Sequence, residues 1–132
     1  MKTRTLYRPV GMKELERIAA LDWRGFPPRL SWQPIFYPVL NQAYAEQIAE
    51  DWNTEDSFSG YCGVVTRFDV DALYLEQYAV HHVGGDGHDE LWIPAEELET
   101  FNRHITGRIE VVKVFTGSQF VLPEDQALKQ YF

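Results

Sequence analysis

Hydrophobic residues recur at helical spacing in two parts of the chain, and both parts are expected to form amphipathic helices. Residues 12–21 carry apolar side chains three and four positions apart between charged neighbours. A second helix is expected to follow Asn41, whose side chain suits the N-cap position. The apolar face of this second helix would consist of Ala45, Ile48, Ala49 and Trp52, at positions i, i+3, i+4 and i+7.

Other stretches have the composition or the two-residue period of β-strands. Residues 3–10 are rich in β-forming residues, and residues 35–37 form a short apolar run closed by Pro38. In residues 61–70 alternate positions are suited to burial, which is the period of a half-buried strand. A further strand is expected over residues 109–115, where β-branched residues predominate.

A short buried strand is expected at residues 91–93, with Trp92 in the core, and it leads into a helix that begins at Pro94. Gly107 is placed to end that helix, whose apolar stripe would consist of Leu98, Phe101 and Ile105. The order of strands and helices is that of a mixed α+β protein with about three short helices. No linker or repeat interrupts the pattern, so a single domain over residues 1–132 is expected.

The net charge narrows the possible partners. It is −8 at pH 7, which disfavours long nucleic acids, because affinity for polyphosphate comes mainly from lysine and arginine. Residues 1–30 nevertheless hold seven basic and three acidic side chains, whereas residues 31–132 hold five and 17. The basic segment could therefore hold a small anion, or its arginines could pair with acids of the body. The chain has neither a secretory signal nor a membrane-spanning run, so a cytoplasmic protein without membrane contact is expected.

The cysteine and the paired histidines predict no special chemistry. Cys62 is the single cysteine and lies in an apolar pattern, so a buried thiol is expected. His81 and His82 are neighbours on an expected strand and would point to opposite faces, so they cannot both bind one ion. No metal site is predicted.

Glu90 is the acid best placed for chemistry, because it stands at the start of the apolar strand at residues 91–93. A strand would fix this carboxylate more firmly than a loop, although a solvated acid in a turn is the alternative. The stretch from His88 to Pro94 resembles the end of the active site of small ADP-ribosyltransferases, in which a strand begins with a glutamate and continues into an apolar run and a proline.

Two further matches occur in the order that this family has. The pair Tyr7-Arg8 is similar to the aromatic residue and arginine on the family's first strand. Residues 35–37, followed by residues 43–49, resemble the strand and the alanine-bearing helix that shape the family's nicotinamide pocket. His88 stands where the family usually has a glutamine or glutamate that helps to choose the acceptor, and a Ser-x-Ser motif is missing.

The resemblance implies an ADP-ribosyltransferase-like split β-sheet fold with NAD as the substrate. It implies that the ADP-ribose is transferred to an unknown protein acceptor or released by hydrolysis. The catalytic residues implied by the resemblance are Glu90, Tyr37 and His88. The residues implied to bind NAD are Tyr7, Arg8, Arg29, Tyr37 and Tyr44.

This chemistry suits the residue types. Cleavage of the bond between nicotinamide and ribose builds positive charge on the sugar, which the carboxylate of Glu90 would stabilise in the transition state. Arg8, helped by Arg4, Arg24 or Arg29, would hold the anionic pyrophosphate through charge-assisted hydrogen bonds. Tyr37 or Tyr44 would stack on the nicotinamide ring. An active enzyme therefore requires the arginine, one of the tyrosines and the glutamate to line one cleft.

Two alternatives share the same fold. One is a catalytically inactive binding module, such as an immunity or regulatory protein that uses its acidic surface to cover a basic partner. The other is a nucleotide-processing enzyme that resembles RNA 2′-phosphotransferases. A fold supports all three functions equally, so the geometry of the site has to decide between them.

Overall fold

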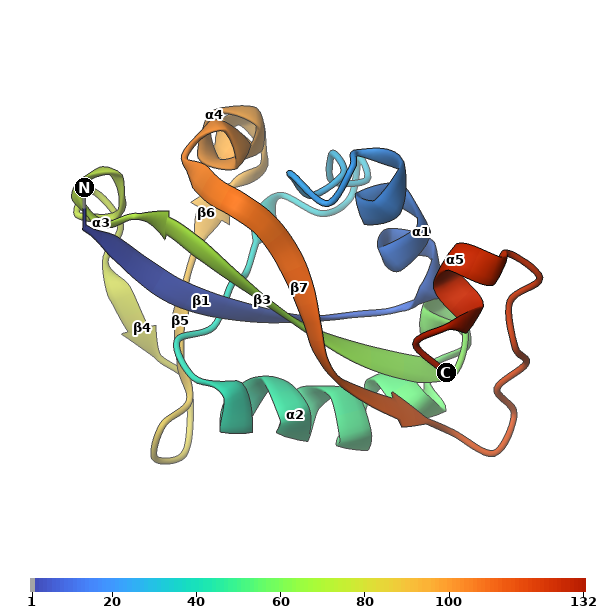
Figure 1. Cartoon of the computed structure of the whole chain (residues 1–132). Helices are drawn as coiled ribbons and strands as arrows, with labels where there is room; N and C mark the ends of the chain where they lie inside the picture. Colours follow the sequence, from blue (N-terminus) through green and yellow to red (C-terminus); the bar gives the residue numbers. More distant parts are fainter. Residues whose placement is uncertain (1) are drawn as a thin grey trace.

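The computed structural model describes residues 2–132, which form strands and short helices (Figure 1). The strands are β1 (Thr3–Val10), β2 (Ile35–Phe36), β3 (Cys62–Asp71), β4 (Val80–His82), β5 (Asp89–Leu91), β6 (Ile93–Pro94) and β7 (Ile105–Thr116). The α-helices are α1 (Met12–Ala20), α2 (Gln42–Asp51), α3 (Ala72–Leu75), α4 (Leu98–Arg103) and α5 (Gln126–Lys129). Three 3₁₀ turns complete these residues: η1 (Asn53–Glu55), η2 (Ser57–Ser59) and η3 (Ala95–Glu97).

The predicted α+β class is confirmed, but the expectation of about three helices is wrong. Within residues 2–132 the structure has five short α-helices. The two additional ones, α3 and α5, have four residues each, and in both an aspartate side chain accepts a hydrogen bond from a backbone N–H of the first turn. Helices this short carry no periodic signal, so their caps alone could have indicated them.

The central sheet has three antiparallel strands in the order β1-β3-β7. The segment around Val39 extends it, because Val39 pairs with Tyr7 of β1 on one side and with Glu90 of β5 on the other. Tyr7 and Val39 exchange two backbone hydrogen bonds of 2.9 and 2.8 Å. Beside them, the N–H of Leu91 donates to Pro38 at 2.9 Å. The β4–β5 hairpin is thereby tied to the central sheet.

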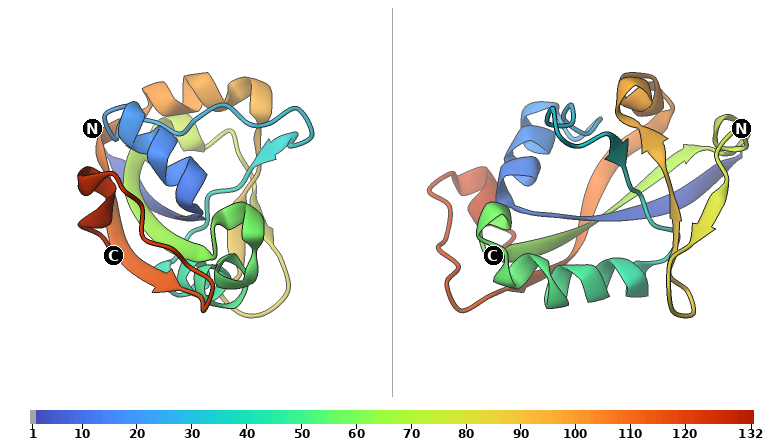
Figure 2. Two further views of the ribbon diagram at one scale, coloured as in Figure 1. Left: turned by 90° about the vertical axis from the view of Figure 1, so that its right-hand side faces the viewer. Right: turned by 180° about the vertical axis from the view of Figure 1, so that it is seen from behind.

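Helices cover both faces of this sheet. In Figures 1 and 2, α2 lies along one face, whereas α1 and α4 lie on the other. The larger core cluster, on the α1 and α4 side, contains Leu6, Phe36, Phe68 and Phe101, which are at most 2% exposed. A smaller cluster under α2 contains Val39, Ala45, Ala49 and Val65, with Tyr7 and Tyr44 packed against it.

Helix α2 begins at the predicted residue and sits unusually close to the sheet. The Asn41 side chain accepts a hydrogen bond of 2.8 Å from the N–H of Tyr44, which confirms the predicted N-cap. The Asn41 amide also donates to the carbonyl of Gly87 in the loop between β4 and β5. A Cβ at Gly63 of β3 would lie 2.6 Å from the Cα and Cβ of Ala49, so glycine is required for this approach.

Two tryptophans predicted to be buried are exposed instead. Trp52 follows the last residue of α2 and is 60% exposed, because the helix ends before its side chain can join the apolar face. Trp92 is 42% exposed between the buried residues Leu91 and Ile93. The apolar run is therefore an alternating strand edge and not a segment buried on both sides.

The region around Gly107 also differs from the expectation. Helix α4 ends at Arg103, and Ile105 is the first residue of β7 and pairs with Val70. Gly107, with φ of 71°, lies inside the strand, beside the irregular register between Arg67 and Asp69 of β3. The β-forming residues that begin at Ile105 outweigh the helical spacing of the apolar positions, and the glycine accommodates a bulge.

Among residues 2–132, helices are too short or too polar to span a lipid bilayer.

Substitution of Gly63 by alanine tests the close packing of α2 on β3. The added methyl group collides with Ala49, and a close-packed core relaxes only partly, so a loss of about 1–3 kcal/mol in the free energy of unfolding is expected. Urea denaturation measures it. Gly85→Ala is the matched control, because a Cβ there meets atoms no nearer than 3.5 Å. Equal stability of the two variants would contradict the packing described here.

Candidate functional site

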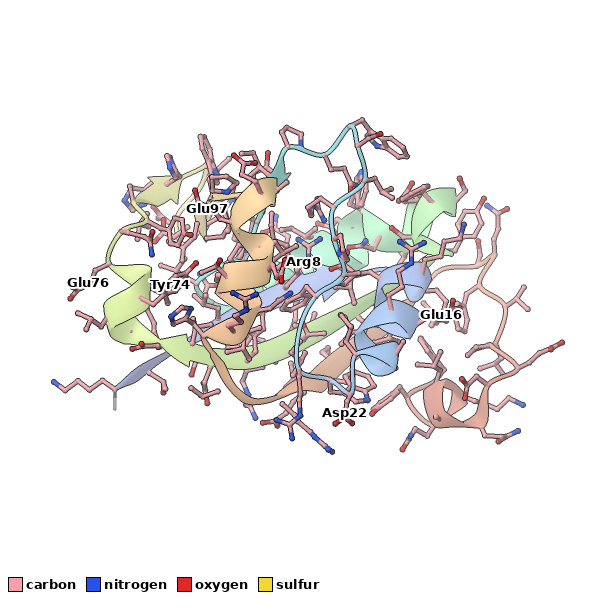
Figure 3. All side chains as sticks on the ribbon, turned by 90° about the horizontal axis from the view of Figure 1, so that it is seen from above. Arg8, Glu16, Asp22, Tyr74, Glu76 and Glu97 are labelled. Carbon is pink, nitrogen blue, oxygen red and sulfur yellow. The ribbon has the colours of Figure 1, made fainter. Side chains whose placement is uncertain are left out.

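A cavity of about 550 Å³ opens beside the C-terminal half of β1. Its walls come from the start of α1, the segment between residues 29 and 39, the β5–β6 region and the C-terminal end of α2 with η1 and η2. This volume lies within the range of small-molecule sites, roughly 300–1,000 Å³. In Figure 3, Arg8 lies in the interior between the ribbons of α1 and α4.

Glu90 is a buried carboxylate in the wall of this cavity. It is 9% exposed and lies in the middle of β5, held between β4 and the segment around Val39. Its Oε2 accepts a hydrogen bond of 3.0 Å from the Tyr44 hydroxyl, and its Oε1 accepts one of 2.8 Å from the Trp92 indole N–H. Glu90 forms no salt bridge with any residue in the range 2–132, so neutral donors alone hold its charge.

A row of side chains on α2 and the hairpin holds Tyr44 in place. The His88 ring stacks on the Tyr44 ring, with centroids 4.4 Å apart and planes 12° apart. His88 Nε2 is 2.9 Å from Gln47 Oε1 and is assigned as the donor, because the amide oxygen can only accept. His88 therefore positions Tyr44, which in turn donates to Glu90, but His88 does not line the cavity.

Arg8 lines the cavity with its charge already paired. The side chain follows the buried Leu6 by two positions on β1, so it faces the same side of the sheet. Its guanidinium donates to both carboxylate oxygens of Glu14, at 2.7 and 2.9 Å, and to the Tyr37 carbonyl at 3.3 Å. It also lies 4.6 Å from the centre of the Phe36 ring. This bidentate geometry fixes the positions of the Arg8 and Glu14 side chains.

Arg29 is the second arginine of the cavity, and its charge has no acidic partner in salt-bridge contact among residues 2–132. Its Nε donates to the Ile35 carbonyl at 3.1 Å. Burial, followed by repulsion from Arg8, lowers the pKa of Arg29 to about 10, and Glu14 opposes this shift. Arg8, Arg29 and Glu14 together therefore leave one positive charge available to an anion.

Aromatic rings border the cavity near Glu90. Tyr37 and Trp92 both line it and meet edge to face, with ring centroids 6.4 Å apart. The His81 ring stacks on the Trp92 ring, with ring centroids 3.6 Å apart. Tyr37 is 40% exposed, so its ring stands at the mouth of the cavity.

The predicted site residues fall into three groups. Arg8, Arg29, Tyr37 and Glu90 line the one cavity, so the structure brings an arginine, a tyrosine and the glutamate together. Tyr44 and His88 lie behind Glu90. Tyr7 packs against α2, on the face of β1 opposite to that of Arg8, and is not among the residues that line the cavity.

Sequence reasoning missed Glu14 and assigned Trp92 to the core. Glu14 is six positions after Arg8, and the turn between β1 and α1 brings the two side chains together. A glutamate in the first turn of an amphipathic helix reads as an ordinary polar position, so the sequence gives no direct signal for this pair. The alternation of Leu91, Trp92 and Ile93 could have indicated that Trp92 faces away from the core.

The site offers separated charges and no metal-binding cluster. Among residues 2–132, no three His, Cys, Asp or Glu side chains gather closely enough to hold a metal ion. Of the charged side chains that line the cavity, Glu90, Asp56, Arg29 and Lys13 form no salt bridge within residues 2–132, whereas Arg8 and Glu14 pair with each other. Such a site suits a ligand with an anionic group and a centre that becomes positive.

Comparisons of the chain with protein-family models, curated proteins and solved structures found no match.

The hydrogen bond between Tyr44 and Glu90 predicts an unusual tyrosine titration. Burial, together with the hydrogen bond to Glu90 and the charge of that carboxylate, raises the pKa of Tyr44 to about 12. Because the neutral phenol is the form that donates, Glu90→Gln is expected to lower this pKa. NMR titration of the ¹³Cζ signal of Tyr44 measures the change.

Glu97→Gln is the matched control for that titration. Glu97 also accepts from a tyrosine hydroxyl, that of Tyr78, which raises the pKa of Tyr78, but it does not line the cavity. In Figure 3, Glu97 lies apart from Arg8. This substitution should lower the pKa of Tyr78 and leave that of Tyr44 unchanged. If Glu90→Gln left the pKa of Tyr44 unchanged, that result would contradict the hydrogen bond between Tyr44 and Glu90.

Proposed function

We propose that the cavity binds NAD and that the protein cleaves its nicotinamide–ribose bond, as an ADP-ribosyltransferase or NAD glycohydrolase with an ADP-ribosyltransferase-like fold. The observation that carries this proposal is the buried Glu90 carboxylate, which neutral donors hold in a cavity that also contains Arg29, and neither has a salt-bridge partner among residues 2–132. The two charges suit the two polar features of the substrate, a sugar that becomes cationic and a pyrophosphate.

Glu90 is the group that lowers the reaction barrier. As nicotinamide departs, the ribose acquires positive charge, and a carboxylate fixed beside it stabilises that charge without reorganising at the moment of reaction. The hydrogen bonds from Tyr44 and Trp92 keep the carboxylate in place, and among residues 2–132 it has no salt-bridge partner. The ground state of NAD gains less from Glu90 than the transition state does, so the interaction accelerates the reaction.

Arg29 holds the pyrophosphate, because the charge of Arg8 is shared with Glu14. A half-buried guanidinium with unused donors binds phosphate oxygens through charge-assisted hydrogen bonds. Arg8 supports Arg29 by keeping Glu14 at a fixed distance, so that the carboxylate offsets the repulsion between the two arginines. Tyr37 and Trp92 cover the nicotinamide ring at the mouth of the cavity.

The assay that tests catalysis follows free nicotinamide during incubation with NAD. Glu90→Gln keeps the shape of the side chain and one acceptor oxygen, replaces the other oxygen with an amide donor and removes the charge, so a loss of roughly 10²–10³-fold in kcat is expected. Glu97→Gln, which loses the same charge beside another tyrosine, should keep wild-type activity. Undiminished release of nicotinamide by Glu90→Gln would exclude Glu90 from the mechanism.

Binding tests the role of Arg29 separately from catalysis. Arg29→Gln removes the unpaired charge, so the affinity for NAD should fall about tenfold, in line with the contribution of a charged hydrogen bond. Isothermal titration calorimetry with Glu90→Gln as the background measures it without turnover. Arg24→Gln is the control, because Arg24 belongs to the same basic segment but pairs with Asp22 at the surface. Equal losses from the two substitutions would contradict a specific anion site.

A further inference from the structure

The C-terminal end of α2, together with η1 and η2, carries carboxylates that no cation of the described chain neutralises. Residues 50–58 contain no lysine or arginine. Their acidic side chains form no salt bridge within residues 2–132, and they belong to Glu50, Asp51, Glu55 and Asp56. All are exposed except Asp56, which is half-buried. Like charges in so short a stretch repel one another, so this surface attracts a cation.

Two of these acids stand where a helix tolerates negative charge least. Glu50 and Asp51 are the last two residues of α2, whose last turn contains no basic residue. The backbone carbonyl groups at that end already carry partial negative charge, which favours a cation and opposes a carboxylate. A conflict of this kind between local sequence and local structure is typical of functional positions. A cation bound at the end of α2 would remove the conflict.

Two large aromatic side chains that the core does not use accompany the acids. Trp52 is 60% exposed and Phe58 is 56% exposed, and both line the cavity described above. Glu50 and Asp51 line a second cavity, of about 470 Å³, between α2 and β7. Exposed apolar side chains with a polar rim are typical of a surface that binds another protein. Tryptophan is among the residue types that contribute most to such binding.

Two lysines of the chain border the two cavities and show that their aromatic rings accept cations. The Lys13 ammonium lies 6.0 Å from the centre of the Phe58 ring in the first cavity. The Lys113 ammonium lies 5.7 Å from the centre of the Phe115 ring in the second. Neither lysine forms a salt bridge within residues 2–132, so the carboxylates beside them stay available to a partner.

We propose that residues 50–58 form a docking surface for a basic segment of another protein, which arginine side chains anchor. A guanidinium of that segment stacks on the Trp52 indole and donates to the carboxylates beside it. Opposite charge steers the two molecules together, and the aromatic contact holds them. The docking surface does not depend on the reaction at Glu90.

The chemistry of the surface favours arginine over other cations. A guanidinium is planar and weakly hydrated, so it stacks on an aromatic ring and keeps its N–H groups free for carboxylates. A lysine ammonium is strongly hydrated and has no flat face to stack. A metal ion would not use the exposed rings, and no three metal-ligating side chains gather closely enough among residues 2–132. Nucleic acid would be repelled by the carboxylates.

Calorimetry with a short synthetic peptide, in which arginine alternates with glycine and serine, tests the docking surface. Trp52→Ala should weaken binding of this peptide about threefold, the scale of a cation–π contact at an exposed site. Trp32→Ala is the matched control, because Trp32 is 68% exposed but lines neither cavity. Both tryptophans are largely exposed, so neither substitution removes core packing.

Asp51→Asn gives a second test, with a readout that a merely structural acid would not produce. The substitution should weaken peptide binding about threefold, because it removes one ion pair of the complex. It should also raise the melting temperature of the free protein, because it removes a carboxylate from the C-terminal end of α2. Glu96→Gln is the control for binding, since Glu96 is exposed and forms no salt bridge within residues 2–132, but lines neither cavity.

Versions of the peptide separate charge from shape. Lysine in place of arginine should weaken binding several-fold, and citrulline, which keeps the planar group without the charge, should weaken it further. Equal binding of the arginine and citrulline peptides would overturn the docking surface. Equal losses from Trp52→Ala and Trp32→Ala, or a lower melting temperature for Asp51→Asn, would do the same.

Two further outcomes identify the occupant and separate this surface from the proposed reaction. A wild-type dimer in sedimentation velocity that Trp52→Ala dissociates would overturn the proposal, because a second copy would then be the occupant. Glu90→Gln should bind the arginine peptide as the wild type does. Peptide binding that depends on Trp52 and Asp51 supports the docking surface even where no nicotinamide is released from NAD, and in that case the proposed reaction fails alone.

Discussion

The two-sided pairing of Val39 is the constraint on which the candidate site depends. Val39 bonds to β1 through Tyr7 and pairs with Glu90 of β5, so it joins two strands that are more than 80 positions apart along the chain. A backbone bridge is short and directional, and it leaves little freedom in the distance between its neighbours. Arg8 and Glu90 therefore reach one cavity through the main chain, without touching each other.

This arrangement explains how opposite charges coexist in a small cavity. Arg8 and Glu14 neutralise each other in a partly buried pair, which avoids the cost of leaving either charge alone. Glu90 and Arg29, which stay without ionic partners among residues 2–132, are held by neutral groups instead. The cavity therefore contains one neutralised pair beside charges that uncharged partners hold in place.

Much of the fold could be predicted from local patterns, and the site only in part. The N-cap at Asn41, the strand at residues 61–70 and the burial of Cys62 follow from propensity and period, and the structure has all three. The cavity itself depends on long-range pairing, which no local window contains. Two features of the site depend on element boundaries, where sequence patterns carry least information. The contact between Arg8 and Glu14 forms across the turn from β1 to α1, and Trp52 is exposed where α2 ends.

Asn41 has a consequence for how the chain tolerates changes of length. Its side chain caps α2 and also donates to Gly87, so one residue fixes both the start of a helix and the tip of the β4–β5 hairpin. Insertions in that hairpin would pull the cap from the helix and shift the strand that carries Glu90. Between β7 and α5, Gly117 packs on Thr54 of η1 and donates to the Tyr61 carbonyl, but the backbone hydrogen bond made by residues 118–124, from Phe120 to Gly117, stays within the C-terminal segment. Changes of length should accordingly be tolerated better within residues 118–124 than at the hairpin tip.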